Sequence, residues 1–447
     1  MRRYTWIWII TLFILVGCQN APVPASPTPT QEPPSQPTST LALTPIGETG
    51  QPTEQPTDPT AAPTLEPTEE ITPTAEAGRE TEPAGTPIPP LTSGKELTVT
   101  EVKMVNPTIG WAVGTQGGGP DHILFTSDGG ETWDDRSPPA RKPERAQRFQ
   151  AWGYFLNSQT AWVIYAADGP PPVSPKVVWK TTDSGISWEA SQTLPLTGQE
   201  PFFEPEGFSF VNSSTGWLLV HVDAGMSHDY SHLYRTADGG QTWERIVDPF
   251  GESLQGLRNT GMAFSTESYG WVTKDNLGVL PGAFLEQTED GGQSWENIFL
   301  PAPEGASWES EPIQCRTFQP VFTSPQTGLV LLECSRPDGS GSLETLSYVY
   351  STSDRGENWQ HTQLPSPVSD LEFVDLQVGY AAGIDIYKTT NGGLDWVKIK
   401  TVTWHGQLTF ISSDLGWAVA RKGEDIALVK TENGGSTWQI VTPIAAP

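Results

Sequence analysis

The sequence predicts an all-β fold: a seven-bladed β-propeller of four-stranded antiparallel blades, preceded by a disordered Pro- and Thr-rich stalk. Three observations predict it. One short phrase recurs seven times, alternating apolar segments precede each copy, and a long stretch without aromatic residues lies before the first copy. A repeat of roughly 40–50 residues is typical of propeller blades. The chain therefore divides into three expected parts, 1–17, 18–94 and 95–447.

The first part, residues 1–17, has the features of a lipoprotein export signal. Two arginines precede an apolar run from Trp6 to Val16, which has the length of a signal-peptide core and is short for a membrane span. The run leads into Leu-Val-Gly-Cys, which resembles a bacterial lipobox. We expect acylation of Cys18 and attachment to a membrane through the lipid. An ordinary signal peptide or a weak transmembrane anchor are the alternatives.

The second part, residues 18–94, is expected to be a disordered linker. From residue 21 it holds 18 prolines and 16 threonines but no Phe, Trp or Tyr. Such a segment cannot bury enough apolar surface to offset the entropy of ordering, and its prolines keep it extended. Its expected role is that of a spacer between the lipid and the domain that follows.

The third part, residues 95–447, contains the repeat Thr-x-Asp/Asn-x-Gly-x-x-Trp. The first and last Trp of the repeat are 305 residues apart, which gives a period of about 51 residues over six intervals. The Asp or Asn and the Trp of the successive copies are Asp128 and Trp133, Asp183 and Trp188, Asp238 and Trp243, Asp290 and Trp295, Asp354 and Trp359, Asn391 and Trp396, and Asn433 and Trp438.

The chemistry of this phrase is that of a β-hairpin turn. Asp and Asn side chains accept hydrogen bonds from backbone N–H groups further along the turn, and Gly adopts the positive φ that tight turns need. The Trp then covers the hairpin. We therefore interpret these residues as structural and not as catalytic.

A second phrase, Gly-Trp or a variant of it, precedes each copy. It reads Gly110-Trp111, Ala161-Trp162, Gly216-Trp217, Gly270-Trp271, Gly328-Leu329, Gly379-Tyr380 and Gly416-Trp417. An alternating apolar strand lies before it and another lies between it and the hairpin turn. Each unit therefore has four expected strands and no helix, which is the pattern of a propeller blade.

The hairpin phrase resembles the Asp-box, or bacterial neuraminidase repeat. Together with the Gly-Trp phrase it is similar to the photosystem II stability and assembly factor family of seven-bladed propellers, over about residues 96–442. The resemblance is weaker in the second, fifth and sixth units, where Ala161, Leu329 and Tyr380 replace the usual residue. It implies the fold and a protein-binding face. Because the lipobox and stalk favour a surface protein, the family's photosynthetic role is not carried over from the resemblance.

Charge and cysteine content agree with export. The formal net charge is −28, which argues against binding to nucleic acid phosphates or to anionic lipid. Besides Cys18 the chain has two cysteines, Cys315 and Cys334, on either side of the Ser324–Gly328 turn. Strands that fold back on that turn would bring them roughly opposite, so we expect a cross-strand disulfide in an oxidising compartment; two buried free thiols are the alternative.

The loops opposite the Asp-box turns are the expected working surface, because functional residues concentrate on irregular segments held by a rigid scaffold. These loops are long in the first five units. They carry aromatic and Arg side chains, which are enriched at protein interfaces. The candidate binding face comprises Arg141, Arg145, Arg148, Phe202, Phe203, Tyr230, Phe250 and Trp308. A solvated loop is the alternative.

Catalysis and cofactor binding have less support. Sialidases share the Asp-box but carry an early Phe/Tyr-Arg-Ile-Pro phrase, which is missing here, and other glycosidases use paired carboxylates that one sequence cannot identify. Three histidines fall between His221 and His232 with Asp223 and Asp229, but in an expected loop their spacing has little meaning for metal binding. We expect no catalytic residues, no metal and no cofactor.

The sequence thus favours a cell-surface or periplasm-facing lipoprotein whose propeller binds another protein or a cell-wall or carbohydrate ligand. A glycoside hydrolase and a membrane-protein assembly factor are the alternatives. The bound ligand, the strand that closes the ring and the oligomeric state remain open at this stage.

Overall fold

The computed structural model describes residues 85–168, 176–198, 200–225, 228–247, 254, 257–304, 306, 308, 313–337, 340 and 342–447. They all fall within one unit, Gly78–Pro447. The expected signal segment, Cys18, most of the expected stalk, and Phe250 lie outside the described residues. The described residues form β-strands and turns without helices, and among them no helix could cross a membrane.

The strands occur in antiparallel sets of four, in sequence order within each set. The first two sets consist of β2 (Thr98–Met104), β3 (Gly110–Thr115), β4 (His122–Thr126) and β5 (Thr132–Asp135), and of β7 (Phe149–Phe155), β8 (Ala161–Ala167), β9 (Val178–Thr181) and β10 (Glu189–Ala190). The third consists of β11 (Glu204–Phe210), β12 (Gly216–Gly225), β13 (His228–Thr236) and β14 (Glu244–Val247). The last two consist of β24 (Val368–Phe373), β25 (Gly379–Gly383), β26 (Asp385–Thr389) and β27 (Val397–Thr401), and of β28 (His405–Phe410), β29 (Gly416–Lys422), β30 (Asp425–Thr431) and β31 (Gln439–Val441).

Between the third set and the last two lies a nine-stranded sheet in which two such sets are joined by an extra strand. Its strands are β15 (Arg258–Phe264), β16 (Gly270–Asp275), β17 (Phe284–Thr288), β18 (Glu296–Phe299), β19 (Gln314–Thr317), β20 (Val321–Phe322), β21 (Gly328–Pro337), β22 (Leu343–Thr352) and β23 (Gln360–Leu364). The extra strand β19 pairs with both β16 and β21. In the register of β19 and β21, Cys315 lies opposite Cys334, and the two are joined in a disulfide.

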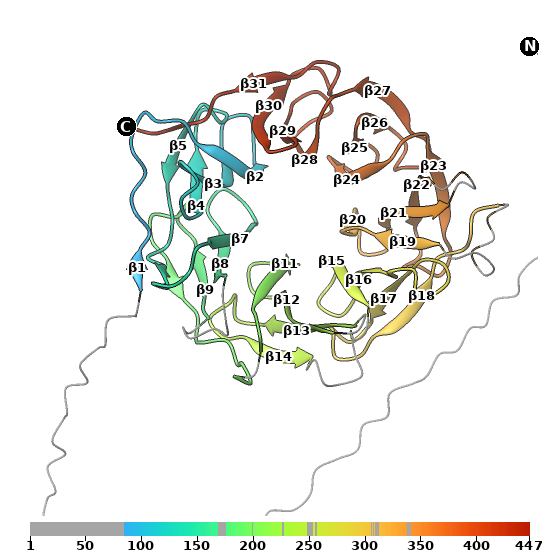
Figure 1. The fold of residues 1–447 in the computed structure, drawn as a ribbon, viewed down its shortest axis with the longest axis horizontal. Coiled ribbons are helices and arrows are strands. Elements are labelled where there is room, and N and C mark those ends of the chain that lie inside the picture. The colour runs from blue at the N-terminus through green and yellow to red at the C-terminus, as the bar shows by residue number, and fades with distance from the viewer. Residues whose placement is uncertain are drawn as a thin grey trace, which may run out of the picture. The chain divides into compact units, whose positions relative to one another are not determined.

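The sets follow one another around a central opening, with the first strand of each set toward the opening (Figure 1). Each apolar core cluster combines side chains of neighbouring sets; one, for example, contains Trp162, Phe210 and Trp243. The hydrophobic core is therefore distributed along the seams between sheets. The sheets cannot bury their apolar faces singly, so the ring forms as a whole.

The aromatic residue of the Gly-Trp phrase builds these seams. Trp162 stacks on Phe210 of the next set, with ring centroids 3.7 Å apart, and its indole N–H donates to the Gly239 carbonyl in that set's Asp-box at 2.8 Å. The same pair of contacts recurs at Trp217, which stacks on Phe264 at 3.6 Å and donates to Gly291 at 2.8 Å. In these two seams one residue thus supplies both apolar area and a buried hydrogen bond.

Three other sets make their seam contacts differently. Trp271 donates to the Tyr269 hydroxyl, which in turn donates to the Arg355 carbonyl of the next Asp-box. Tyr380 stacks on the next set's Phe410 and donates to the Ser413 carbonyl. Leu329 has no polar group to contribute, and its seam has hydrogen bonds from other residues instead: the Thr362 hydroxyl donates to the Leu394 carbonyl at 2.8 Å, and the Val368 N–H donates to the Ser347 hydroxyl at 3.2 Å.

Each Asp-box turn is a closed set of hydrogen bonds. In the third set the Asp238 carboxylate accepts from the Thr236 hydroxyl at 2.9 Å and from the N–H and hydroxyl of Thr242 at 3.0 and 2.6 Å. Gly240 has a φ of 92° and donates its N–H to the Thr236 hydroxyl. These bonds hold the pKa of Asp238 below its usual range against the effect of its partial burial.

The ring is closed by the chain ends. The short strand β32 (Ile444–Ala445) pairs in parallel with the outer edge of β5, and Leu97 donates its N–H to the Pro443 carbonyl. At the same seam Trp417 donates to the Gly129 carbonyl at 3.0 Å. The last and first sets are thus joined by backbone pairing as well as by the recurrent aromatic contact, which the sequence alone did not indicate.

The domain also begins earlier than residue 95. Strand β1 (Thr86–Pro87) pairs with β6 (Arg141–Lys142), and Ile88 and Leu91 pack against core clusters. The expectation of a linker that runs to residue 94 is therefore wrong for residues 85–94. These residues include two apolar side chains that the ring buries in part, and the Pro content masked that signal.

Candidate functional site

The Asp-box turns and the turns between the first two strands of each set lie together on one face. Backbone hydrogen bonds join them: Gly239 donates to Ser214, Gly291 to Ser268, and the same pairing recurs in the other sets. The connections between second and third strands and those between sets lie at the other ends of the strands. We call the first the Asp-box face and the second the loop-rich face.

The loop-rich face is asymmetric. The hairpins β12–β13 and β21–β22 have strands of nine or ten residues. In contrast, a single residue, Ile384, connects β25 to β26, and Gly423 and Glu424 connect β29 to β30. The segment from His221 to His232, expected to be a loop, belongs to the long β12–β13 hairpin: after a register shift that follows His221, Asp223 pairs with Tyr230 and Gly225 pairs with His228.

Only some residues of the candidate binding face are exposed. Arg145 and Arg148 are exposed, whereas Arg141 is half-buried and donates from Nε to the Gly85 carbonyl at 3.0 Å. Phe202 and Tyr230 are half-buried.

Two of the expected contact residues belong to the core. Phe203 and Trp308 are only 4% and 6% exposed and pack into apolar clusters, Trp308 beside the Cys315–Cys334 disulfide. Their assignment to the binding face is wrong. A long loop between sheets must cover the sheet edges beneath it, and it uses its aromatic residues for that purpose.

A pocket of about 460 Å³ opens on the loop-rich side of the seam between the second and third sets. Trp152 on β7 and Phe202 supply aromatic walls. The charged and polar lining residues are Arg148, Gln150, Asp168, Glu204, Glu206, His221 and Arg258. A concave site of this size with aromatic walls and a few polar groups is the usual form of a ligand pocket.

The polar side of the pocket is centred on His221. Its two ring nitrogens lie 3.6 Å from Glu204 Oε2 and 3.6 Å from Asp229 Oδ1, and Phe202 packs its ring edge-on at 4.8 Å. Asp168 has a different role: it accepts from the backbone N–H groups of Gln147 and Arg148 and so fixes the chain at the pocket edge.

Glu206 is the unusual group of this pocket. Its Oε2 is buried and has no hydrogen-bond partner among the described residues. Burial raises the pKa of Glu206 to about 8, the nearby Asp229 adds to this effect, and Arg258 and Lys274 oppose it. Lys274 is itself buried, with its Nζ 3.1 Å from Glu286 Oε2. The carboxyl group of Glu206 is therefore largely protonated at neutral pH.

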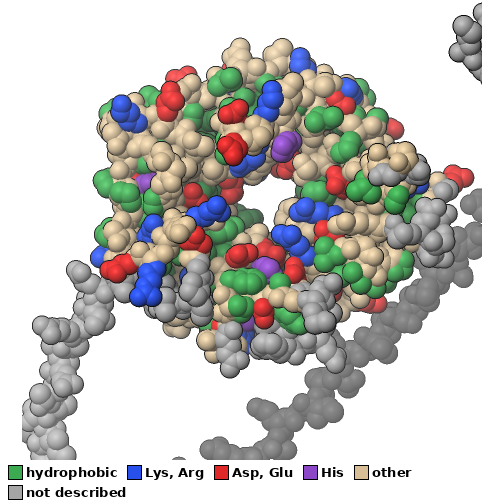
Figure 2. Space-filling model, in the orientation of Figure 1, with side chains coloured by type: hydrophobic (Ala, Val, Ile, Leu, Met, Phe, Trp, Pro, Cys, Tyr) green, Lys and Arg blue, Asp and Glu red, His purple; other side chains and the backbone are tan. Residues whose placement is uncertain are grey.

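Sequence reasoning missed Gln150, Trp152, Glu206, His221 as a pocket residue, and Arg258. One signal was available: Gln150 and Trp152 alternate along β7, directly after Arg148, and Glu204 and Glu206 alternate along β11, although a bulge follows Pro205. Polar residues at alternating positions of an innermost strand face the central opening. Figure 2 shows that acidic and basic side chains border this opening together.

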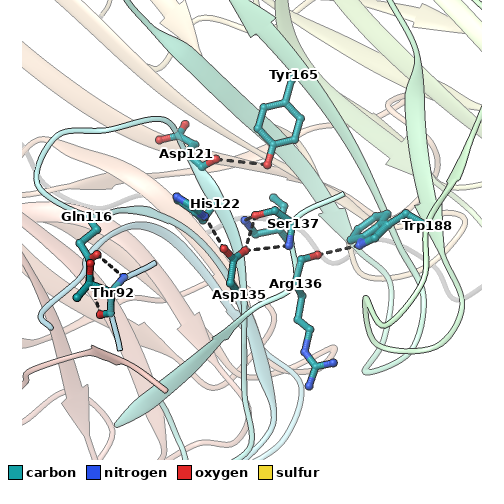
Figure 3. A network of polar contacts seen from close by, with 10 residues as sticks. Thr92, Gln116, Asp121, His122, Asp135, Arg136, Ser137, Tyr165 and Trp188 are labelled. Carbon is teal, nitrogen blue, oxygen red and sulfur yellow. Dashed lines mark hydrogen bonds and ion pairs between the residues drawn. The ribbon is translucent and has the colours of Figure 1, made fainter. Parts of the chain in front are cut away.

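A second polar cluster, between the first and second sets, is structural. The His122 ring and the Ser137 hydroxyl both bond to Asp135, at 2.8 and 2.6 Å, so the carboxylate stands between them (Figure 3). A nucleophilic Ser would need His as its neighbour. Ser137 also accepts from the Ile123 N–H, and His122 is buried, so this cluster joins β4 to the segment after β5.

Among the described residues no group of His, Cys, Asp and Glu has the arrangement of a metal site. His221 and Asp229 come together, but Glu204 is their third neighbour and is itself mostly exposed. The side chain of His228 lies outside the description.

The fold and its recurrent seams define a class: a β-propeller with Asp-box repeats. The family model for the photosynthesis system II assembly factor YCF48 matches residues 90–260. The chain is a β-propeller similar to the photosystem II assembly factors.

Two relatives carry this similarity. The photosystem II stability/assembly factor HCF136 of Oryza sativa subsp. japonica, a chloroplast protein, is 25% identical over 320 residues, 66% of this chain and 68% of the rice protein. The photosystem II assembly lipoprotein Ycf48 of Synechococcus sp. (strain CC9902) is 26% identical over 196 residues, 44% of this chain and 48% of that protein. The match thus covers about half of the Synechococcus protein.

Solved structures include a YCF48 bound to a D1 peptide. That structure is 20% identical to this chain, covers 76% of this chain and 93% of its own, and has a TM-score of 0.45.

Proposed function

We propose that this chain is a non-catalytic, lipid-anchored scaffold that binds a segment of another protein through its loop-rich face. Each set of four strands forms one blade, including the two sets that β19 joins, so the propeller has seven blades. The one observation that carries the proposal is the pocket between the second and third sets. It combines aromatic walls with charged groups of both signs, on the face that the repeat leaves irregular.

The anchor and the location are part of the same proposal. The lipobox at Cys18 and the Pro- and Thr-rich linker would hold the propeller at a distance from a membrane, outside the cytoplasm. The Cys315–Cys334 disulfide supports an oxidising compartment. One relative is itself named a lipoprotein.

The relatives favour one kind of partner. Both are named as photosystem II assembly factors, and one structure of a YCF48 holds a peptide of another protein. By analogy, the partner of this chain is a segment of a membrane protein during its assembly. The photosynthetic role itself is not part of the proposal, because it rests on the relatives' names alone.

Glycoside hydrolysis is the second candidate, favoured by the carboxylates Glu204 and Glu206 in one pocket. The contacts of these groups weigh against it. Glu204 is 67% exposed at its side chain, and Asp229, the next carboxylate, faces His221. A glycosidase needs two carboxyl groups directed at one bond from opposite sides.

The test is site-specific crosslinking in cells that express the full chain. A photoreactive residue replaces Arg145 on the loop-rich face or, as the control, Glu357 on the Asp-box face; both are exposed. We expect a discrete protein adduct from position 145 and none from position 357. Equal adducts from both positions, or none from position 145, would contradict the proposal, and turnover of a glycoside panel by the purified chain would favour the enzyme.

A further inference from the structure

The pocket between the second and third sets has a composition that narrows the chemistry of its ligand. The argument rests on the proposed function, since it concerns the part of a bound protein segment that enters this pocket. Three independent features bear on it: the aromatic walls, the buried carboxyl group, and the distribution of charge around the opening.

The aromatic walls attract cations as well as apolar groups. Trp152 is half-buried on β7, and Phe202 is held in place by the His221 ring at 4.8 Å. The face of an aromatic ring attracts an ammonium or guanidinium group within about 6 Å, and Trp does so most strongly. Elsewhere in this chain Lys and Arg side chains already lie over aromatic rings in this way, for example Lys180 over Trp162 at 5.6 Å.

Two buried polar atoms at the polar end of the pocket have no hydrogen bond among the described residues. Glu206 Oε2 is buried and no described residue donates to it. His221 Nε2 is likewise buried without a hydrogen bond, and its nearest charged neighbour is Asp229 at 3.6 Å. A buried carboxyl oxygen without a partner costs about 1–3 kcal/mol, so a ligand that supplies N–H donors there gains what the free protein lacks.

The charged residues around the pocket favour a positively charged ligand. Glu204 and Asp229 lie at the polar end, Glu206 adds a negative charge when it ionises, and the whole chain has a formal charge of −28. Such a field attracts cations over a distance of several ångströms. Arg148 and Arg258 are exposed among the lining residues, so a ligand with several adjacent cations would meet repulsion there.

From these features we propose that the pocket binds one Lys or Arg side chain of the partner segment. The aliphatic part of that side chain packs between Trp152 and Phe202, and its cationic group reaches Glu206. Arg148 and Arg258 then face the residues beside it, which favours a basic residue flanked by acidic or neutral ones. The selectivity is for a single cation and not for a basic cluster.

The test uses the full chain and short blocked peptides, with binding measured by isothermal titration calorimetry. The probe is a Gly pentapeptide with a central Arg, and the matched neutral probe has Gln at that position. The variants are Glu206→Gln and Trp152→Leu, and the control is Glu357→Gln, which makes the same Glu-to-Gln change on the Asp-box face. We expect saturable binding of the Arg peptide, with the Kd raised about tenfold or more by either pocket variant and less than about twofold by the control.

A pH series adds a readout that a merely structural effect would not give. Cation binding favours the ionised form of Glu206, so the proton that this group holds at neutral pH is released on binding. The Kd should therefore fall about fivefold as pH rises from about 7 to about 8, and this dependence should disappear in Glu206→Gln. The other charged groups that face Glu206 are Glu204 on β11, His221 on β12, Asp229 on β13, Arg258 on β15 and Lys274 on β16.

The outcomes separate this inference from the proposed function. If the Gln peptide binds as well as the Arg peptide, or neither binds at about 5 mM, which is weaker than any useful side-chain site, the cation site is refuted. If the crosslink from position 145 persists in Glu206→Gln while the peptide results are negative, the scaffold function stands and only the cation site fails. If the chain with an unchanged pocket gives no adduct from position 145, the proposed scaffold function itself is contradicted.

Discussion

The two faces of this ring are built by different rules. On the Asp-box face, the same residues recur in every set and make the same hydrogen bonds, from Thr126 and Asp128 in the first to Thr431 and Asn433 in the last. On the loop-rich face, a nine- or ten-residue strand pair stands beside a connection of one residue. The repeat encodes the ring, and the residues outside the repeat form the pocket.

This difference teaches where substitutions should act. The Asp-box face and the seams contribute stability, because the Asp and Asn side chains of the turns are hydrogen-bonded and the aromatic residues of the Gly-Trp phrase are buried. The pocket instead leaves buried polar atoms of Glu206 and His221 without hydrogen bonds, which is a cost to stability that ligand binding would offset. Substitutions at the seams should therefore lower stability, and those at the pocket should lower binding.

The largest expected effect is at the seam that closes the ring. Trp417 is fully buried, donates to the Gly129 carbonyl and packs with residues of the first set. Trp417→Ala should lower the free energy of unfolding by about 3–5 kcal/mol in urea titration followed by circular dichroism. Trp417→Phe, which keeps most of the apolar area and loses the N–H, should cost about 1–3 kcal/mol.

The control for this seam is Ile186→Ala, since Ile186 is 73% exposed on the Asp-box face. It should change stability by less than about 0.5 kcal/mol. A Trp417→Ala protein as stable as the Ile186→Ala protein would show that the seams do not hold the ring together.

A smaller effect is expected within a single Asp-box. Asp238→Ala removes the acceptor of the Thr242 N–H and hydroxyl and should cost about 1–2 kcal/mol. The chain provides its own matched control, because Asn433 in the last box donates from its amide to the Thr437 hydroxyl at 2.9 Å and accepts from the Thr437 N–H. Asp238→Asn should therefore cost less than Asp238→Ala.

The stability of the unsubstituted chain and that of Asp238→Asn should depend differently on pH. The pKa of Asp238 is lowered in the folded chain, so its contribution to stability is present above the unfolded pKa and is lost as pH falls through the folded one. The difference in stability between the unsubstituted chain and Asp238→Asn should shrink between about pH 4 and about pH 2. A difference that stays constant over this range would rule out the ionised carboxylate as the source.

Particular residues explain how much of this fold and site could be predicted. The Asp-boxes, the Gly-Trp strands and the strands around Cys315 and Cys334 are local patterns, and local chemistry specifies them. Closure by Ile444 and Ala445 could not be predicted, because two residues of apolar character have no period. The reason for the Gly in the Gly-Trp phrase also became clear only from the structure: a Cβ on Gly216 would lie 2.2 Å from the Phe210 ring.

The pocket was harder to predict for a different reason. A large side chain in a loop can either contact a partner or cover the edge of a sheet. The sequence alone does not distinguish these two roles, and only the structure shows that Arg145 is exposed and Trp308 is buried. Trp152 and Glu206 lie on regular strands, and the alternation of residue types there predicted a strand but gave no sign of a binding site. Only the packing of the second set against the third brings them together.

The central claim is that the working surface lies on the face that the repeat leaves irregular. Hydrogen–deuterium exchange of the full chain, alone and with the partner recovered by crosslinking from position 145, tests it most directly. The account predicts slower exchange in residues 147–152, 202–206 and 257–259, with the Asp-box turns unchanged. Slower exchange confined to the Asp-box turns, such as 126–133 and 236–243, would contradict it.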